Sequence, residues 1–133
     1  MKEPLFVDTS ALYAFFNAKA PEHPKIKRFL NDFQGTVLLT NYIFDEIVTL
    51  VGARVGHDKA VLVGNVLLNS PQVRRVWISP NDEKEAWDLF VSRDDKAYSF
   101  TDCTSFVVMR RLKIFRCLAL DEHFGQEGFE VLP

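Results

Sequence analysis

Short apolar runs alternate along this chain with longer segments whose apolar residues recur at helical spacing. The runs expected to form strands cover residues 4–8, 36–39, 73–78, 114–120 and 129–132. Runs such as TVLL at 36–39 have no polar face, which is typical of strands that helices cover on both sides. Since strands that alternate with helices usually pair in parallel, the sequence predicts an α/β fold built on a mostly parallel sheet.

Helix signals occupy the intervals between these runs. Residues 24–34 carry apolar side chains at helical spacing, and Gly35 follows them as a typical helix end. Pro80 and the acidic residues after it favour the first turn of another helix. The helical segments predicted in this way cover residues 9–18, 24–34, 40–56, 58–69, 79–93 and 101–113. No repeat or linker divides the chain, so we expect residues 1–133 to form one domain.

Composition narrows the class of protein. The chain has a formal net charge of −2 and 47% hydrophobic residues, which is ordinary for a globular protein. Without a broad basic surface, any contact with nucleic acid must come from local cationic patches. We expect Cys103 and Cys117, both in apolar surroundings, to be reduced core thiols. With no signal peptide and no apolar run of membrane-spanning length, the expected location is the cytoplasm.

Acidic residues follow two of the predicted strands. Asp8 ends the first strand, and Asp121 follows the CLAL sequence of the fourth. In open α/β sheets, ligands bind beyond the carboxyl ends of the strands, at the point where the strand order reverses. Each aspartate taken alone is equally explained as a helix cap or a turn residue, so that alternative stays open.

Two further acids fall in predicted helices. Asp102 lies in a first helical turn, where the helix dipole favours negative charge. Helical geometry places it within about 40° of Phe106 and about 20° of Met109, on the buried side. Glu46 lies at the edge of an apolar stripe, whereas its neighbour Asp45 lies on another arc of the same helix. This geometry favours Glu46 only modestly, and two surface acids remain an alternative.

Carboxylates that converge in one pocket repel one another unless a cation binds among them. Oxygen ligands, with no histidine or thiolate clearly placed among them, suit Mg²⁺ or Mn²⁺. Two such ions about 4 Å apart stabilise the attacking and leaving oxygens of a phosphodiester displacement. The candidate metal ligands and catalytic residues of a nuclease are therefore Asp8, Glu46, Asp102 and Asp121.

Four stretches of the sequence together match a known family. They are FVDTSAL near the start, then TNYIFDEIVTL, SFTDCTSFVVMRRLKI and finally LALDEHFGQEGFEVLP. In this order they resemble the PIN-domain ribonucleases, and among them the VapC-type toxins of bacterial and archaeal toxin–antitoxin pairs. The SFTDC and LDEHF…GF…LP pieces are the most specific, and residues 57–98 carry little of the match.

The resemblance implies a single PIN-like domain with a parallel five-stranded sheet flanked by helices. It also implies that Asp8, Glu46, Asp102 and Asp121 hold Mg²⁺ or Mn²⁺, and that a metal-activated water cuts single-stranded or looped RNA. Toxins of this kind usually form homodimers and are blocked by a small antitoxin protein. All four acids of the family's pattern are present in this chain.

Other polar and aromatic residues have more modest interpretations. Thr9 and Ser10 are either helix caps or hydroxyls that orient Asp8 or contact phosphate. We expect His123 to be a solvent-facing turn residue and not a catalytic one. A basic run near residue 110 is either a solvated face or a contact for the RNA backbone; it comprises Arg110, Arg111, Lys113 and Arg116. A candidate partner-binding patch comprises Tyr13, Phe15 and Phe16.

Three other classes of protein share parts of this pattern. A phosphoacceptor receiver domain needs an acidic pair after its first strand and a lysine after its last core strand, but Thr9 follows Asp8 and Asp121 stands at the lysine position. A phosphatase with an aspartate nucleophile expects DxD, which DTS does not supply. A PIN domain that only binds RNA or serves as a scaffold usually lacks one or more of the acids. The sequence leaves open whether the chain is a toxin or a housekeeping RNA-processing nuclease.

Overall fold

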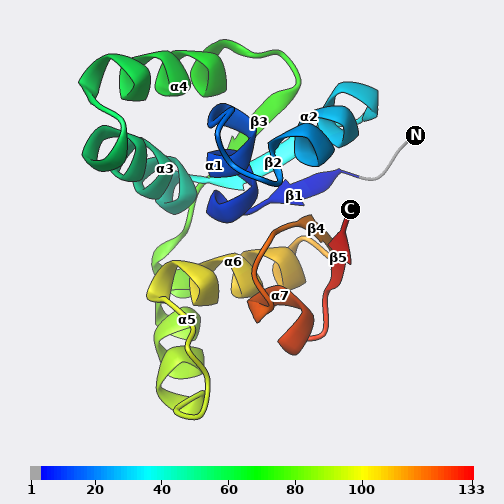
Figure 1. The fold of residues 1–133 in the computed structure, drawn as a ribbon. Helices are drawn as coiled ribbons and strands as arrows, with labels where there is room; N and C mark the ends of the chain where they lie inside the picture. Colours follow the sequence, from blue (N-terminus) through cyan, green and yellow to red (C-terminus); the bar gives the residue numbers. More distant parts are fainter. Residues whose placement is uncertain (1–3) are drawn as a thin grey trace.

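The computed structural model describes residues 4–133, which form a five-stranded parallel sheet with helices on both faces (Figure 1). The strands are β1 (Leu5–Val7), β2 (Val37–Thr40), β3 (Val73–Val76), β4 (Arg116–Leu118) and β5 (Glu130–Leu132). Their order across the sheet is β3-β2-β1-β4-β5, and all four neighbouring pairs are parallel. The predicted α/β class and the parallel five-stranded sheet are therefore confirmed.

Two groups of helices cover the sheet. The helices are α1 (Thr9–Phe16), α2 (His23–Asp32), α3 (Asn41–Arg54), α4 (His57–Asn69), α5 (Pro80–Ser92), α6 (Phe100–Arg111) and α7 (His123–Gln126). In Figure 1, α1 to α4 lie on one side of β1, and α5 to α7 lie on the other. Right-handed crossovers require this division, because the chain proceeds outward from β1 to β3 and then returns to begin β4 on the opposite side of β1.

The predicted elements are found within a few residues of their expected ends, with two differences near the C-terminus. The strand predicted over 114–120 ends earlier, because β4 stops at Leu118, and Asp121 lies on the loop beyond it. The short helix α7 was not predicted, because its four residues are too few to show a helical period. Its Phe124 is fully buried, and the ring centroid lies 4.9 Å from that of Phe106 in α6. This contact anchors the loop that carries Asp121.

The centre of the sheet and helix α6 form the core. All three residues of β1 and all four of β2 are buried, as the apolar runs predicted. Every residue of α6 from Asp102 to Met109 is buried. Cys103 and Cys117 are buried free thiols, and burial raises their pKa values to about 11 and about 12. Within residues 4–133, no helix is both long and apolar enough to cross a membrane.

The basic run at the end of α6 has acidic partners in the fold. Arg111 donates from two nitrogens to the two carboxylate oxygens of Asp82, at 2.9 Å each, and so ties α6 to α5. Arg110 donates to the carboxylate of Glu127 at 2.8 Å. Both arginines lie at the opposite end of α6 from Asp102. The structure thus gives Arg110 and Arg111 a role in holding helices together, and a contact of the basic run with RNA stays an untested prediction.

The carboxyl group of Asp82 is fully buried and depends on its partners to remain charged. Burial opposes its ionisation, but hydrogen bonds from Arg111 and Ser79 outweigh that effect and lower its pKa. A lowered pKa means that the pair stabilises the fold above pH 3.8, the usual pKa of aspartate, and that this contribution is lost as the pH falls below it.

We predict that Arg111→Ala lowers the free energy of unfolding by about 2–4 kcal/mol, because it leaves a buried carboxylate without its counter-ion. Urea denaturation near neutral pH measures the loss, and the gap to wild type should narrow below about pH 4. Arg74→Ala is the matched control, since Arg74 is exposed and forms no ion pair among residues 4–133; it should cost less than about 0.5 kcal/mol. Equal losses in the two variants would show that Asp82 does not need Arg111.

Candidate functional site

A cavity of about 500 Å³ opens beyond the carboxyl ends of the central strands. The strand order reverses between β1 and β4, and the Asp8 amide donates to the Leu118 carbonyl across this junction at 3.0 Å. The cavity therefore lies at the switch point where α/β folds bind ligands. Its lining includes the four acids selected from the sequence, which are Asp8, Glu46, Asp102 and Asp121. We call it the acidic cavity.

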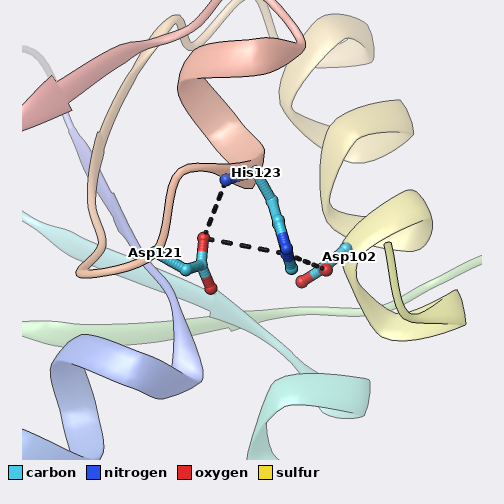
Figure 2. A group of neighbouring side chains, drawn as sticks. All are labelled: Asp102, Asp121 and His123. Carbon is cyan, nitrogen blue, oxygen red and sulfur yellow. Dashed lines mark hydrogen bonds and ion pairs between the residues drawn. The ribbon is translucent and has the colours of Figure 1, made fainter. Parts of the chain in front are cut away.

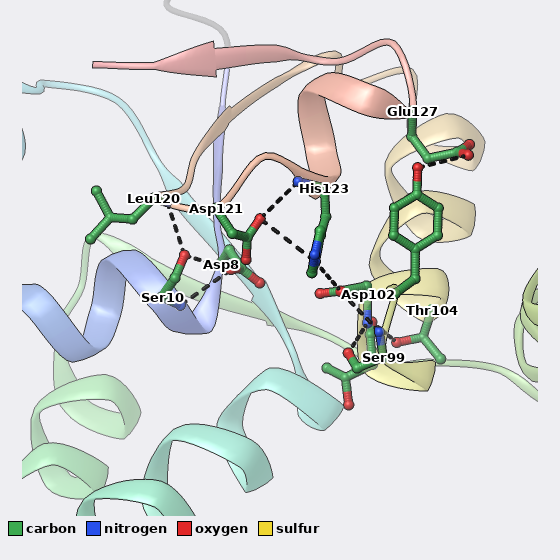
Figure 3. Close-up of polar contacts among 11 residues, drawn as sticks. Asp8, Ser10, Ser99, Asp102, Thr104, Leu120, Asp121, His123 and Glu127 are labelled. Atoms are coloured by element: carbon green, nitrogen blue, oxygen red, sulfur yellow. Dashed lines mark hydrogen bonds and ion pairs between the residues drawn. The ribbon is translucent and has the colours of Figure 1, made fainter. Parts of the chain in front are cut away.

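Asp8 is both a helix cap and a member of this cavity. It directly follows β1, and its side chain is the N-cap of α1. Its Oδ2 accepts hydrogen bonds from the Ser10 amide at 3.2 Å and from the Ser10 hydroxyl at 2.7 Å. The same hydroxyl accepts from the Leu120 amide at 3.0 Å (Figure 3). Ser10 therefore joins the loop after β1 to the loop after β4 and orients Asp8.

Asp102 also combines two roles. It is the third residue of α6 and forms a capping box with Ser99, whose amide donates to Asp102 Oδ2 at 3.0 Å. Nδ1 of His123 lies 2.8 Å from the same oxygen. When this carboxylate is ionised it only accepts hydrogen bonds, and the proton of the bond then belongs to Nδ1. The first turn of α6 and the histidine of α7 thus hold Asp102 from two sides.

His123 is not the solvent-facing residue that the sequence suggested. Its side chain is only 23% exposed and packs edge-on against Tyr98, with ring centroids 5.5 Å apart. One ligand atom from each of Asp102, Asp121 and His123 lies within 4.8 Å of the others (Figure 2). The DEHF sequence by itself carried no signal for this position, because α7 turns the imidazole back over Asp102 and no periodic pattern revealed α7.

The two adjacent acids of α3, Asp45 and Glu46, lie in different surroundings. Glu46 is half-buried and lines the acidic cavity, whereas Asp45 is exposed and lies outside the lining. Leu50 and Arg54 follow Glu46 at intervals of four residues and line the cavity with it. Residues four apart share a helix face, so one face of α3 forms this wall. Arg54 is a cationic residue of the site that sequence reasoning missed.

Burial and mutual repulsion disfavour ionisation within the cluster. Asp8 is only 3% exposed, and its burial raises its pKa to about 7, with the charges of Asp102 and Asp121 adding to the effect against the Ser10 hydrogen bonds. Burial likewise raises the pKa of Asp102, although its bonds from Ser99 and His123 oppose the rise. A bound cation would stabilise the ionised forms of both carboxylates and so offset the effects of burial and repulsion.

Ligand atoms of Asp102, Asp121 and His123 lie close enough together to share a metal ion, and Asp8 and Glu46 line the same cavity. Each aspartate uses one oxygen for hydrogen bonds within the protein, namely Oδ2 of Asp8, Oδ2 of Asp102 and Oδ1 of Asp121. Among the described residues, the other oxygen of each accepts no hydrogen bond, and neither does the carboxylate of Glu46. Oriented carboxylates with free lone pairs are the ligands that Mg²⁺ and Mn²⁺ prefer. The hydroxyl of Thr9, buried in the same lining, also lacks a partner among residues 4–133.

Comparison with known proteins gives consistent matches along the chain. The PIN domain model matches residues 5–128. The VapC20 protein of Mycobacterium tuberculosis, named a 23S rRNA-specific endonuclease, is 38% identical over 130 residues, which cover 97% of this chain and 98% of that protein. A VapC ribonuclease of Archaeoglobus fulgidus is 26% identical over 124 residues, covering 90% of this chain and 78% of that protein.

Solved structures agree in fold. The crystal structure of Mycobacterium tuberculosis VapC20, described as a sarcin-ricin loop cleaving toxin, superposes with a TM-score of 0.89 at 36% identity, covering 94% of this chain and 95% of that one. FitAcB from Neisseria gonorrhoeae superposes with a TM-score of 0.73 at 13% identity, over 97% of this chain and 96% of that one. At that identity the second match supports the fold alone.

We predict that Asp8→Asn stabilises the metal-free protein at neutral and higher pH, because it removes a buried charge and keeps an oxygen that accepts from Ser10. A raised pKa makes ionisation costly to the folded state, so the gain is absent below about pH 4, grows up to about pH 7 and is complete above it. Calorimetry in EDTA at about pH 8 should show a gain of at least about 1 kcal/mol, or about 4 °C in Tm. Asp45→Asn, an exposed change, should show no such pH-dependent gain. A less stable Asp8→Asn variant would mean that the cap outweighs the charge.

Proposed function

The chain belongs to the PIN-domain family, and we propose that it is a metal-dependent endoribonuclease that acts as the toxin of a toxin–antitoxin pair. The observation that carries the proposal is the meeting of four carboxylates in one cavity at the switch point of the sheet. The likeness to VapC20 over 97% of the chain supports the choice of RNA as substrate. It also makes a 23S rRNA loop the first substrate to test.

In the proposed site, Asp8, Glu46, Asp102 and Asp121 would hold Mg²⁺ or Mn²⁺. The bound metal would supply a water activated for attack and a Lewis acid for the phosphodiester. The protein's own part is to hold the carboxylates in place: Ser10 orients Asp8, while Ser99 and His123 orient Asp102. His123 is a positioning residue in this scheme, since its Nδ1 is engaged by Asp102.

Partners and location follow the same line of reasoning. A small antitoxin protein is the proposed inhibitor, because the relative VapC20 is described as a toxin. A homodimer remains a prediction that rests on the family resemblance, and a cytoplasmic location remains a prediction made from the sequence. Size-exclusion chromatography with light scattering tests the homodimer directly.

We predict that Mn²⁺ and Mg²⁺ raise the Tm of the protein, because they bind the folded cluster and not the unfolded chain. A concentration one hundred times the dissociation constant should add about 2.7 kcal/mol to the free energy of unfolding. A thermal-shift titration measures this, and cleavage of a 23S rRNA fragment should require the same ions and stop in EDTA. Asp102→Asn should lose both the Tm increase and the cleavage. Cleavage that persists in EDTA, or no Tm response at millimolar Mn²⁺, would contradict the metal site.

A second prediction compares the two neighbouring acids of α3. Glu46→Gln keeps the shape of a cavity-lining side chain and removes its charge, so it should lower the cleavage rate by about a hundredfold or more. Asp45→Asn changes an exposed residue and should alter stability by less than about 0.5 kcal/mol and activity little. Both variants are assayed on the same RNA with saturating Mn²⁺. An inactive Asp45→Asn with an active Glu46→Gln would reverse the assignment.

A further inference from the structure

A second cavity, of about 530 Å³, adjoins the acidic cavity and shares Tyr13 and Arg54 with it. It is formed where α1 and α3 end and α4 begins, three helices that lie together in Figure 1. The polar and aromatic residues of its lining are Tyr13, Phe16, Asn17, Lys19, Arg54 and Lys59. We call it the basic cavity.

The two cavities have opposite electrostatic character. The acidic cavity is lined by four carboxylates, whereas the lining of the basic cavity contains Lys19, Arg54 and Lys59 and no acidic residue. Among residues 4–133, none of these three cations forms an ion pair. Arg93 and Arg110, by contrast, are both held by Glu127. The cations of the basic cavity are therefore available to a ligand.

Arg54 lies at the boundary between the two cavities. It follows Glu46 by two turns on the same face of α3. Its guanidinium carbon lies 5.4 Å from the centre of the Tyr13 ring, close enough for a cation–π contact. Arg54 and Tyr13 are thus held together, and both residues belong to the linings of the two cavities.

Because this inference rests on the proposed ribonuclease function, it concerns the same substrate. We propose that the basic cavity binds the RNA strand beside the scissile phosphodiester, with Arg54 on the nearest phosphate and Lys19 and Lys59 on the phosphate after it. Tyr13 and Phe16 supply apolar contact for the sugar or base between them. The aromatic patch that the sequence suggested as a partner site is thereby assigned, in part, to RNA.

RNA fits this surface better than an acidic protein segment does. A strand that places one phosphodiester among the carboxylates must leave that cavity over a neighbouring surface, and it brings a negative charge with each nucleotide. A cationic groove with aromatic side chains is the usual means of binding single-stranded nucleic acid. With a net charge of −2, the protein has no general attraction for RNA, so local cations next to the acids must supply it.

The test compares variants by their affinity for RNA and by the salt dependence of that affinity. The probe is a fluorescein-labelled single-stranded RNA of about 12 nucleotides, within the range one binding groove covers, and anisotropy is read with Ca²⁺ in place of Mn²⁺. Lys19→Ala combined with Lys59→Ala should weaken RNA binding about 10- to 100-fold. The slope of log Kd against log salt should fall by about 0.7 for each phosphate that the variant no longer neutralises. Arg54→Ala should weaken binding about tenfold, with partial rescue by Arg54→Lys.

The matched control is Lys25→Ala combined with Arg28→Ala, two exposed cations that line a different cavity beside α2. Its RNA affinity should stay within about twofold of wild type. In cleavage assays the combined Lys19→Ala and Lys59→Ala substitutions should raise KM and leave kcat nearly unchanged, since neither lysine lines the acidic cavity. This pattern separates them from Glu46→Gln, which should lower kcat.

Three results would overturn the proposal. The first is unchanged RNA affinity and salt slope in the basic-cavity variants while the wild type still cleaves RNA. That result would reject the basic cavity as an RNA site and leave the proposed nuclease function intact. The second is displacement of the RNA probe by a polyglutamate peptide of equal charge as effectively as by unlabelled RNA, which would assign the cavity to acidic protein segments. The third is a wild-type protein that neither binds nor cleaves RNA, which would remove the proposed function as well.

Discussion

The placement of four carboxylates around one partly buried cavity is the constraint on which the rest of this structure depends. Burial and mutual repulsion together raise the pKa of Asp8 to about 7, a cost that the fold bears at its most central junction. The backbone contact between Asp8 and Leu118, the bridging hydroxyl of Ser10 and the histidine of α7 all serve to hold these charges in a set geometry. A divalent cation bound among these carboxylates would offset their burial and repulsion, which is the basis of the proposed metal site.

Two of the four acids that line the cavity also act as helix caps. Asp8 caps α1, and Asp102 completes the capping box of α6. The sequence left open whether these aspartates are helix caps or metal ligands. The cap role does not exclude the ligand role, because each carboxylate has two oxygens. One oxygen satisfies backbone groups at the start of a helix, and this fixes the direction in which the other points.

Two groups of cationic side chains can be distinguished, those that form ion pairs with buried acids and those that line the basic cavity. Arg93, Arg110 and Arg111 are committed to the buried acids Glu127 and Asp82, and so connect the helices on one side of the sheet. Lys19, Arg54 and Lys59 gather instead beside the acidic cavity and have no acidic partner among residues 4–133. In the proposed function, this distribution would let a chain with a net charge of −2 bind RNA next to an acidic centre.

The sequence by itself predicted the parallel sheet, its first six helices and four acids that all line the acidic cavity, while the catalytic and metal-binding roles of these acids stay predictions. These features follow from local patterns, since the strand and helix periods repeat within a few residues and acids after parallel strands share one edge. Only the tertiary structure decided that His123 supports Asp102, that Arg111 pairs with Asp82, and that Lys19, Arg54 and Lys59 line one cavity. The first two are contacts between residues of different helices, 21 positions apart for His123 and Asp102 and 29 for Arg111 and Asp82. The periodicity of a single helix or strand cannot predict contacts across such separations. These residues come together only when whole helices pack on the sheet.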